Sequence, residues 1–489
     1  MGREERQQIR AAEVEALRCA DCARADSAAR DVEPVDRMPI PAEALEGFPD
    51  GVPKVRRYDR RSFLRNGILG VASVYAATRV DWQRAFEAAA AAGPGSCLVC
   101  LYLNGGNDGL NTIVPIGGDY ATYQAGRPNL ARALGPSSAT QVGTTAIPGT
   151  GSQLGWANVC VSGTGNNNDT RGFDTLYGDG SGGPGSDLAL FPAADYTPPN
   201  LSHFDSRDYW FAGALQKLTT GWIGRWLDLY GSPDNPLQAV SIDTALSKQI
   251  RTLKAPVSAV SSLNGVKFQV DNVGTSADPT GEVANLAAVP AGAGNVGLGR
   301  SRQVYGLTVS VARSLAGVNG TLGTGYPQSS LSQKLQLAAV LLAANLGVRI
   351  VTVDWGSFDT HGGQLQSQDP QLVTLSRALA AFKADLAARG VENRVVTLVF
   401  SEFGRRFKSN ESGTDHGAGG LMMASGSSVR GGLLGPHPGV QRLDSNGDLN
   451  VTTDFRSVYQ ALIGEWLGGD PGAVLPGGPF PGLAAPLIA

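Results

Sequence analysis

The chain has 489 residues, enough for two or three domains or for one large α/β enzyme. Hydrophobic residues make up 42% of it and charged residues only 17%, which favours a globular protein over a disordered one. The net charge of −3 and the isoelectric point near 5.9 argue against nucleic-acid binding, which needs a basic face. Outside the N-terminal region no stretch of about 20 apolar residues occurs, so no stable transmembrane span is expected.

The N-terminal region has the residue order of an export signal. Arg60-Arg61-Ser62-Phe63-Leu64 precedes a short, mildly apolar run, and this order resembles a twin-arginine signal. The alternative is a basic, amphipathic first helix. We therefore predict a signal region at 60–92, recognition by the twin-arginine translocation machinery, and delivery to the periplasm, the cell surface or the outside.

Residues 1–59 predict a disordered, solvated leader extension. They are charged and lack a periodic apolar pattern. Cys19 and Cys22 form an isolated C-x-x-C, which is either part of this leader or a zinc or redox site. We expect no disulfide among the three remaining cysteines, Cys97, Cys100 and Cys160.

The remainder, 93–489, predicts a single α/β domain. Candidate strands alternate with candidate helices, which indicates a mostly parallel central sheet with helices on both faces. The candidate strands are 97–103, 188–196, 348–355 and 394–400, and the candidate helices are 331–347, 370–390 and 455–468. Two polar segments, a Gly/Ser-rich one at 135–187 and another at 256–300, predict loop insertions. The first of these is either partly disordered or carries short strands.

Reactive residues gather in the loops after these strands. In an open parallel sheet the ligand binds beyond the carboxyl ends of the strands, where these loops meet. Three of the four histidines of the chain lie in such loops, beside carboxylates and glycines. The residues concerned are Asp108, Ser202, His203, Asp205, Asp359, His361, Glu402, Asp415 and His416. Carboxylates and imidazoles bind zinc, and carboxylates also suit magnesium, manganese or calcium, so this set predicts two divalent ions.

Six motifs in this order resemble one family. They are "GGNDGLN", "SHFDSRDYW", "FDTHGGQ", "SEFGRR", "GTDHGAGG" and "TTDFRSVYQALIGEWLG". Together, behind a twin-arginine signal, they resemble the family catalogued as domain of unknown function 1501. That family is similar to the alkaline phosphatase and sulfatase superfamily of two-metal α/β hydrolases. The resemblance runs from about residue 97 to 470 and implies an alkaline-phosphatase-like fold.

The resemblance also implies a set of metal ligands. Asp108 matches the first ligand aspartate of the superfamily, and Asp415-His416 matches its adjacent Asp-His pair. Asp359 and His361 match the Asp and His of the other metal, although one residue separates them where the superfamily often has three. Glu402 either binds a metal or orients a ligand, and His437 is either the last imidazole or an exposed loop residue. Asp108 also reads as a turn cap, and Glu402 as a partner of Arg405 or Arg406.

Two hydroxyl groups compete as the nucleophile. Ser202 precedes a predicted helix, where the helix dipole favours an anion, but it also reads as the helix N-cap. Thr112 is the second candidate. His203 is either a ligand or a general acid. Arg405 and Arg207 are candidates for binding substrate oxyanions, or for ordinary salt bridges.

Two functions follow from this interpretation. The first is an exported, metal-dependent hydrolase of phosphate or sulfate esters, acting on a small-molecule or polymer substrate through Ser202 or a water activated by metal. The second is a non-catalytic exported protein that keeps the phosphatase-like fold and binds a metal or a partner. The sequence contains no G-x-S-x-G elbow and no P-loop.

Overall fold

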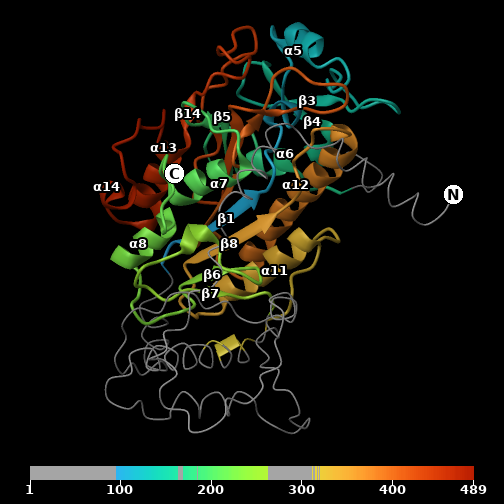
Figure 1. Cartoon of the computed structure of the whole chain (residues 1–489). Coiled ribbons are helices and arrows are strands. Elements are labelled where there is room, and N and C mark those ends of the chain that lie inside the picture. The colour runs from blue at the N-terminus through green and yellow to red at the C-terminus, as the bar shows by residue number, and fades with distance from the viewer. Residues whose placement is uncertain are drawn as a thin grey trace, which may run out of the picture.

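A nine-stranded sheet forms the centre of the protein (Figure 1). The computed structural model describes residues 95–163, 169–183, 185–262, 311, 314–315, 318 and 320–489. The strands lie in the order β13-β5-β12-β9-β1-β8-β6-β7, and β14 pairs with β5. Their bounds are β1 Cys97–Leu103, β5 Leu188–Asp195, β6 Ala239–Ser241, β7 Ser258–Ala259, β8 Ile350–Trp355, β9 Val395–Phe400, β12 Gly420–Ser425, β13 Gly432–Leu433 and β14 Thr453–Asp454.

The sheet is mixed, so the prediction of a mostly parallel sheet is wrong. Strand β12 runs antiparallel to both of its neighbours, β5 and β9, whereas β1 is parallel to β8 and β9. A next strand parallel to β9 would begin at the opposite edge of the sheet from the one where β9 ends. The chain would then need a crossover connection to reach that edge. An antiparallel neighbour begins at the edge where β9 ends. The connection at 401–419 therefore stays at the carboxyl edge of β9.

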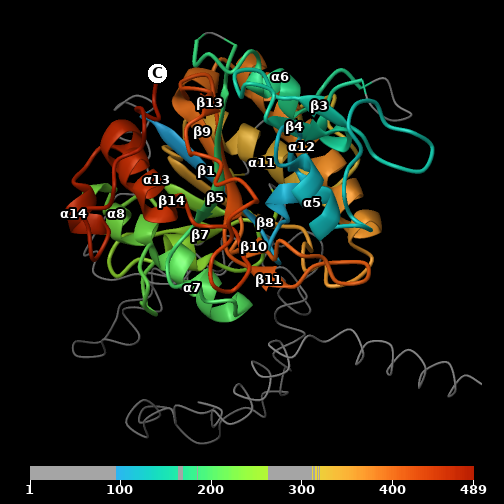
Figure 2. The same ribbon diagram turned by 90° about the horizontal axis from the view of Figure 1, so that it is seen from above.

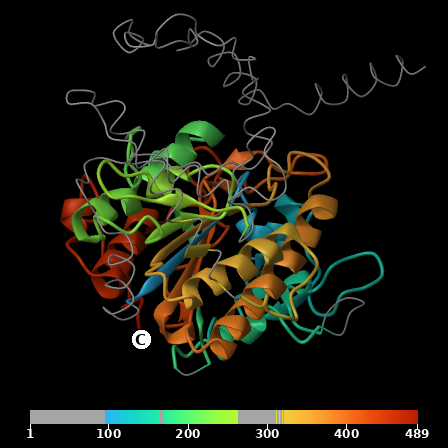
Figure 3. The ribbon, with the colours of Figure 1, turned by 90° about the horizontal axis from the view of Figure 1, so that it is seen from below.

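Helices cover both faces of the sheet. Strand β1 is wholly buried, and its alternate side chains enter two different cores. Val99 and Leu101 pack with the helix pair α11 and α12, whereas Leu98 and Tyr102 pack with aromatic residues of α7, α8 and α13. The two groups of helices lie on opposite sides of the sheet (Figure 3). The α-helices are α5 Tyr120–Gly126, α6 Phe173–Tyr177, α7 His203–Ala212, α8 Trp222–Tyr230, α11 Ser330–Ala343, α12 Gln364–Ala388, α13 Phe455–Ala461 and α14 Pro471–Val474.

The predicted helices form, but with different starts and ends. Helix α12 begins six residues before the predicted start at Pro370, and this proline lies inside the helix. Ser412 accounts for the early start, because its side chain and carbonyl accept from the backbone N–H groups of Gly363 and Gln364. The segment predicted at 455–468 forms α13 followed by a π-helical segment at Leu462–Leu467, and it packs into the aromatic core.

The predicted Gly/Ser-rich insertion carries short strands and contributes to the core. A three-stranded antiparallel sheet joins β2 Ile113–Pro115, β4 Leu154–Ala157 and β3 Thr144–Ala146 (Figure 2). Trp156 and Tyr177 are buried, with ring centroids 5.8 Å apart. A further pair, β10 Gly404–Arg405 and β11 His416–Gly417, is antiparallel. The remaining turns are the 3₁₀ segments η2 Gly109–Asn111, η3 Asn158–Cys160, η4 Lys248–Ile250 and η5 Glu392–Arg394.

Several predictions fall outside the described residues. The leader at 1–59, the signal region at 60–92, the C-x-x-C and most of the segment 256–300 are among them. Cys97, Cys100 and Cys160 are buried and free, as expected. Within the part that is described, no helix has the length and apolar character needed to cross a membrane.

Candidate metal centre

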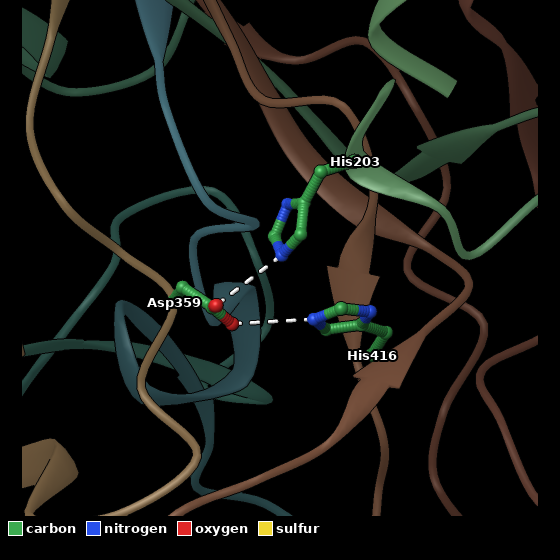
Figure 4. Close-up of side chains that lie close together, drawn as sticks. All are labelled: His203, Asp359 and His416. Atoms are coloured by element: carbon green, nitrogen blue, oxygen red, sulfur yellow. Dashed lines mark hydrogen bonds and ion pairs between the residues drawn. The ribbon is translucent and has the colours of Figure 1, made fainter. Parts of the chain in front are cut away.

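Three imidazoles meet one carboxylate at the carboxyl edge of the sheet. The Nε2 atoms of His361 and His416 lie 3.0 and 3.2 Å from Asp359 Oδ1, and His203 Nε2 lies 3.3 Å from Asp359 Oδ2. The two nitrogens of His361 and His416 are 3.0 Å apart. Figure 4 shows His203 and His416 pointing at Asp359 from two different segments. The structure therefore brings together four of the predicted site residues.

Each of these residues reaches the site from an element that ends or begins there. His203 is the first residue of α7. Asp359 and His361 follow β8, and His416 lies in β11 just ahead of β12. Because β12 is antiparallel to β9, the His416 loop lies at the same edge as the loop that carries Glu402.

Close backbone contacts hold the loops together, and two of them require glycine. A Cβ on Gly105, whose φ is +110°, would lie 2.4 Å from the backbone nitrogen of Asp359. A Cβ on Gly413 would lie 2.3 Å from the carbonyl oxygen of Thr360. Glycine at these positions allows the loop after β1 and the His416 loop to lie against the Asp359 loop.

The outer nitrogen of every imidazole is held by an acceptor. His203 Nδ1 lies 2.7 Å from Glu402 Oε1, His416 Nδ1 lies 2.8 Å from the Leu201 carbonyl, and His361 Nδ1 lies 3.0 Å from Asp415 Oδ1. An ionised carboxylate or a carbonyl only accepts, so each Nδ1 carries the hydrogen. In the neutral imidazoles the Nε2 lone pairs then face Asp359. This arrangement of outer partners is typical of histidines that bind a metal.

A bound cation would give the nitrogen and oxygen atoms of this cluster better partners than the protein alone provides. His203 Nε2 is buried and has no hydrogen-bond partner within the described part of the chain, although Asp359 lies close. One donor atom from each of His203, Asp359 and His416 lies within 4.8 Å of the others. This group of two imidazole nitrogens and one carboxylate oxygen suits zinc, with manganese and iron as further candidates, and His361 Nε2 lies beside it, 3.0 Å from Asp359 Oδ1. The residues therefore fit one divalent ion.

The charges of the site shift the pKa values in opposite directions. Burial lowers the pKa of His203, but its contacts with the Asp359 and Glu402 carboxylates outweigh burial and raise the pKa to about 9. Burial, together with the charges of Arg405 and the other imidazoles, lowers the pKa of His416. Burial raises the pKa of Asp359, but the three imidazoles and Arg405 hold it well below its usual range. Without a metal, a proton on His203 therefore takes the place of a cation.

Glu402 contacts the outer nitrogen of His203 and is not itself in the cluster. It is wholly buried and accepts hydrogen bonds from the backbone N–H groups of Gly105 and Gly106, at 3.0 and 3.1 Å, as well as from His203. Burial raises its pKa, but the bond to His203 outweighs this and the pKa is lowered. Glu402 thus ties the glycine turn after β1 to the first residue of α7.

Arg405 lies behind the site and its nitrogens are already in use. Its side chain is buried and donates to Asp359 Oδ1 at 2.8 Å. Its remaining hydrogens go to the carbonyls of Gly105, Gly106, Phe358 and Thr414. The geometry gives Arg405 the task of joining three loops, where the sequence suggested contact with substrate. Arg207, the other candidate, lies over the ring of Phe204, 5.8 Å from its centroid.

Asp108 stands apart from the cluster and takes the capping role. Its Oδ1 accepts from the backbone N–H of Leu110 at 3.1 Å. Its Oδ2 accepts from the guanidinium of Arg127, which is also buried, and from the amide of Gln364. A guanidinium thus neutralises this carboxylate in the structure.

The hydroxyl groups of both candidate nucleophiles form hydrogen bonds with the backbone. Ser202 Oγ caps α7 by accepting from the backbone N–H of Asp205 at 3.5 Å. Thr112 is buried, and its hydroxyl donates to the carbonyl of Asp108 at 2.9 Å. Asp205 itself forms an ion pair with Lys217.

His437 lies outside the cluster and has its own environment. Its Nδ1 accepts from the backbone N–H of Gly439 at 3.1 Å, which requires a neutral ring. Burial lowers its pKa to about 4, against a weak opposing effect of Asp119.

Acidification should therefore destabilise the protein through His437. The folded-state pKa lies below the unfolded value near 6.5, so this stability is complete above pH 6.5 and is lost as the pH falls towards 4. We expect a loss of about 2–3 kcal/mol in the free energy of unfolding, which His437→Gln should largely remove, because glutamine accepts from Gly439 without titrating. Urea unfolding of both proteins at pH 7 and pH 4.5 measures the difference. An equal acid loss in both would contradict the assignment.

Comparison with known families adds one match. Residues 316–470 match the model of the family described as "Protein of unknown function (DUF1501)". The matched stretch contains Asp359, His361, Glu402, Asp415 and His416 but begins after His203. It supports the resemblance to this family that the motifs predicted. No curated protein matches the chain.

Sequence reasoning missed the groups that position the ligands. The Leu201 carbonyl and the glycine N–H groups are backbone atoms and leave no residue-type signal. Arg127 lies 19 positions and Gln364 256 positions from Asp108, and nothing in their local pattern indicated the contact. The one indication of these groups in the sequence is that glycine-rich loops lie next to them.

Proposed function

We propose that this protein is an exported, metal-dependent hydrolase of phosphate or sulfate esters, with one divalent ion bound by His203, His361, His416 and Asp359. The observation that carries the proposal is the convergence of three Nε2 atoms on one carboxylate, each imidazole being fixed at Nδ1. The twin-arginine order and the resemblance to the alkaline phosphatase and sulfatase superfamily support export and ester hydrolysis.

One ion accounts for the geometry better than two. Asp108 is neutralised by Arg127, Glu402 is saturated by N–H donors, and Asp415 contacts the outer nitrogen of His361. Among the described residues only one group of donor atoms converges. The sequence predicted two divalent ions, and we propose one.

The chain contributes orientation and charge. When bound, a divalent ion would supply Lewis-acid polarisation of an ester oxygen and would lower the pKa of a nearby water. Glu402, Leu201 and Asp415 fix the three imidazoles, and Arg405 holds Asp359 in place. Water is the favoured nucleophile, because the hydroxyls of Ser202 and Thr112 serve the fold. Attack by this water on the phosphorus or sulfur atom would break its bond to the ester oxygen. The products would be the alcohol and the phosphate or sulfate, which keeps the oxygen of the water.

Metal analysis combined with Ser202→Ala tests this proposal. The protein purified without chelator should hold about one equivalent of a divalent metal, and Ser202→Ala should keep that content and a kcat within about threefold of the wild-type value. Elemental analysis and hydrolysis of chromogenic esters measure both. A metal-free protein that takes up none on reconstitution would refute the proposal. Loss of turnover in Ser202→Ala with metal retained would restore serine as the nucleophile.

The second function, a non-catalytic exported metal- or partner-binding protein, rests on a specific observation. Both hydroxyls and Arg405, the residues expected to act on substrate, are engaged in the fold. Under this alternative the protein binds one metal but hydrolyses no phosphodiester, phosphate monoester or sulfate ester.

A further inference from the structure

The groups around the candidate metal centre have a defined charge. Asp359, Glu402 and Asp415 are carboxylates, and Arg405 is a guanidinium, so neutral imidazoles leave two net negative charges. A single divalent ion brings this set to neutrality. A substrate therefore meets a site without excess positive charge.

Asp415 is the exposed member of this set. Its side chain is 56% exposed, whereas that of Asp359 is 35% exposed and those of Glu402 and Arg405 are buried completely. One oxygen lies 3.0 Å from His361 Nδ1. An incoming anion thus meets the Asp415 carboxylate first.

The loop that carries Asp415 is fixed by its backbone. The N–H of Thr414 donates to the carbonyl of Thr360 at 3.1 Å, and the N–H of Arg406 donates to the carbonyl of Asp415 at 3.0 Å. Gly413 is packed against the backbone of the Asp359 loop. The backbone that carries the Asp415 carboxylate is therefore held against the Asp359 loop.

No opposing cation balances Asp415 in the described part of the chain. Its carboxylate contacts His361 Nδ1 there, and all three nitrogens of Arg405 donate to Asp359 or to backbone carbonyls. Lys217 is paired with Asp205 at 2.5 Å. These side chains therefore offer no positively charged partner to a negative group of the substrate.

Resting on the proposed function, we propose that Asp415 selects substrates by charge. The site takes tetrahedral esters with a single negative charge, namely phosphodiesters or sulfate esters, and disfavours dianionic phosphate monoesters. The physical reason is that a second negative charge is repelled by Asp415, whereas the single divalent ion is already balanced by the carboxylates.

Calorimetry on the zinc-loaded full chain at pH 8 tests this charge selection. Diethyl phosphate, a monoanion, should bind more tightly than inorganic phosphate, which is a dianion at that pH. Asp415→Asn keeps an acceptor for His361 Nδ1 and removes the charge. It should tighten phosphate relative to diethyl phosphate by roughly 3- to 8-fold, the size expected for one charge at about 7 Å in a partly aqueous site. The ratio of kcat/KM for 4-nitrophenyl phosphate and bis(4-nitrophenyl) phosphate should move in the same direction.

Glu411→Gln is the matched control, because Glu411 is an exposed acid of the same loop. It should leave the binding ratio within twofold, and both variants should keep one zinc. A wild-type preference for phosphate over diethyl phosphate, or equal effects of the two variants, would overturn the charge selection alone. Failure to bind zinc would overturn the proposed function itself.

Discussion

Asp359→Ala should abolish metal binding while the sheet remains folded. Asp359 is the one carboxylate that all three imidazoles face, and both of its oxygens take part. Outer-shell changes cost metal sites 10–100-fold in affinity, so loss of a direct ligand should raise the zinc Kd roughly 1000-fold. Competition titration with a chromogenic chelator measures this Kd, and far-ultraviolet circular dichroism checks the fold.

Asp208→Ala is the control for that experiment. Asp208 lies on α7, is 26% exposed and forms an ion pair with Lys248, so it resembles Asp359 in burial and pairing but not in position. It should bind zinc as the wild type does. If Asp359→Ala also retained one equivalent with unchanged affinity, the metal centre would have to be sought elsewhere.

Arg405→Met should destabilise the protein strongly. The arginine is buried, and its removal leaves the Asp359 carboxylate and four backbone carbonyls without these donors. Removing one partner of a buried ion pair typically costs about 3–5 kcal/mol, so we expect a loss of that size in the free energy of unfolding. Urea denaturation measures it.

The neighbouring Arg406 provides the comparison. Its side chain is 38% exposed and lies 3.8 Å from the buried Asp448, so Arg406→Met should cost less stability than Arg405→Met. The pair of variants separates the two roles considered for Arg405. If Arg405→Met left stability unchanged and lowered only kcat/KM, Arg405 would bind substrate, as the sequence suggested.

Most of the core elements could be predicted from local patterns. Strand β1 was predicted with its observed bounds, because an uninterrupted apolar run is typical of a strand buried on both faces. Strand β12 was missed, because it begins at a glycine directly after the glycine-rich His416 loop and reads as a continuation of that loop. The direction of β12 is a property of the whole sheet and has no local signal.

The candidate site was predictable in its residues but not in their roles. The rarity of histidine and its place beside carboxylates after strands indicated His203, His361 and His416. Asp108 and Glu402 belong to the same pattern, yet a guanidinium and backbone N–H groups occupy their oxygens. The guanidinium comes from 19 positions along the chain, and the N–H group of Gly105 from 297 positions away. Composition and spacing therefore identify which groups gather, and packing decides which of them face the centre.

The segments that would bind the ion lie far apart in the sequence. A bound ion would therefore also affect the stability of the fold. Leu201 and His416 are 215 positions apart, and Asp359 and His416 are 57 apart. An ion bound only in the folded state would act as a removable cross-link between these distant segments. At a free metal concentration a thousand times the Kd, it would add about 4 kcal/mol to the stability. The start of α7, the loop after β8 and β11 would then unfold as one cooperative unit.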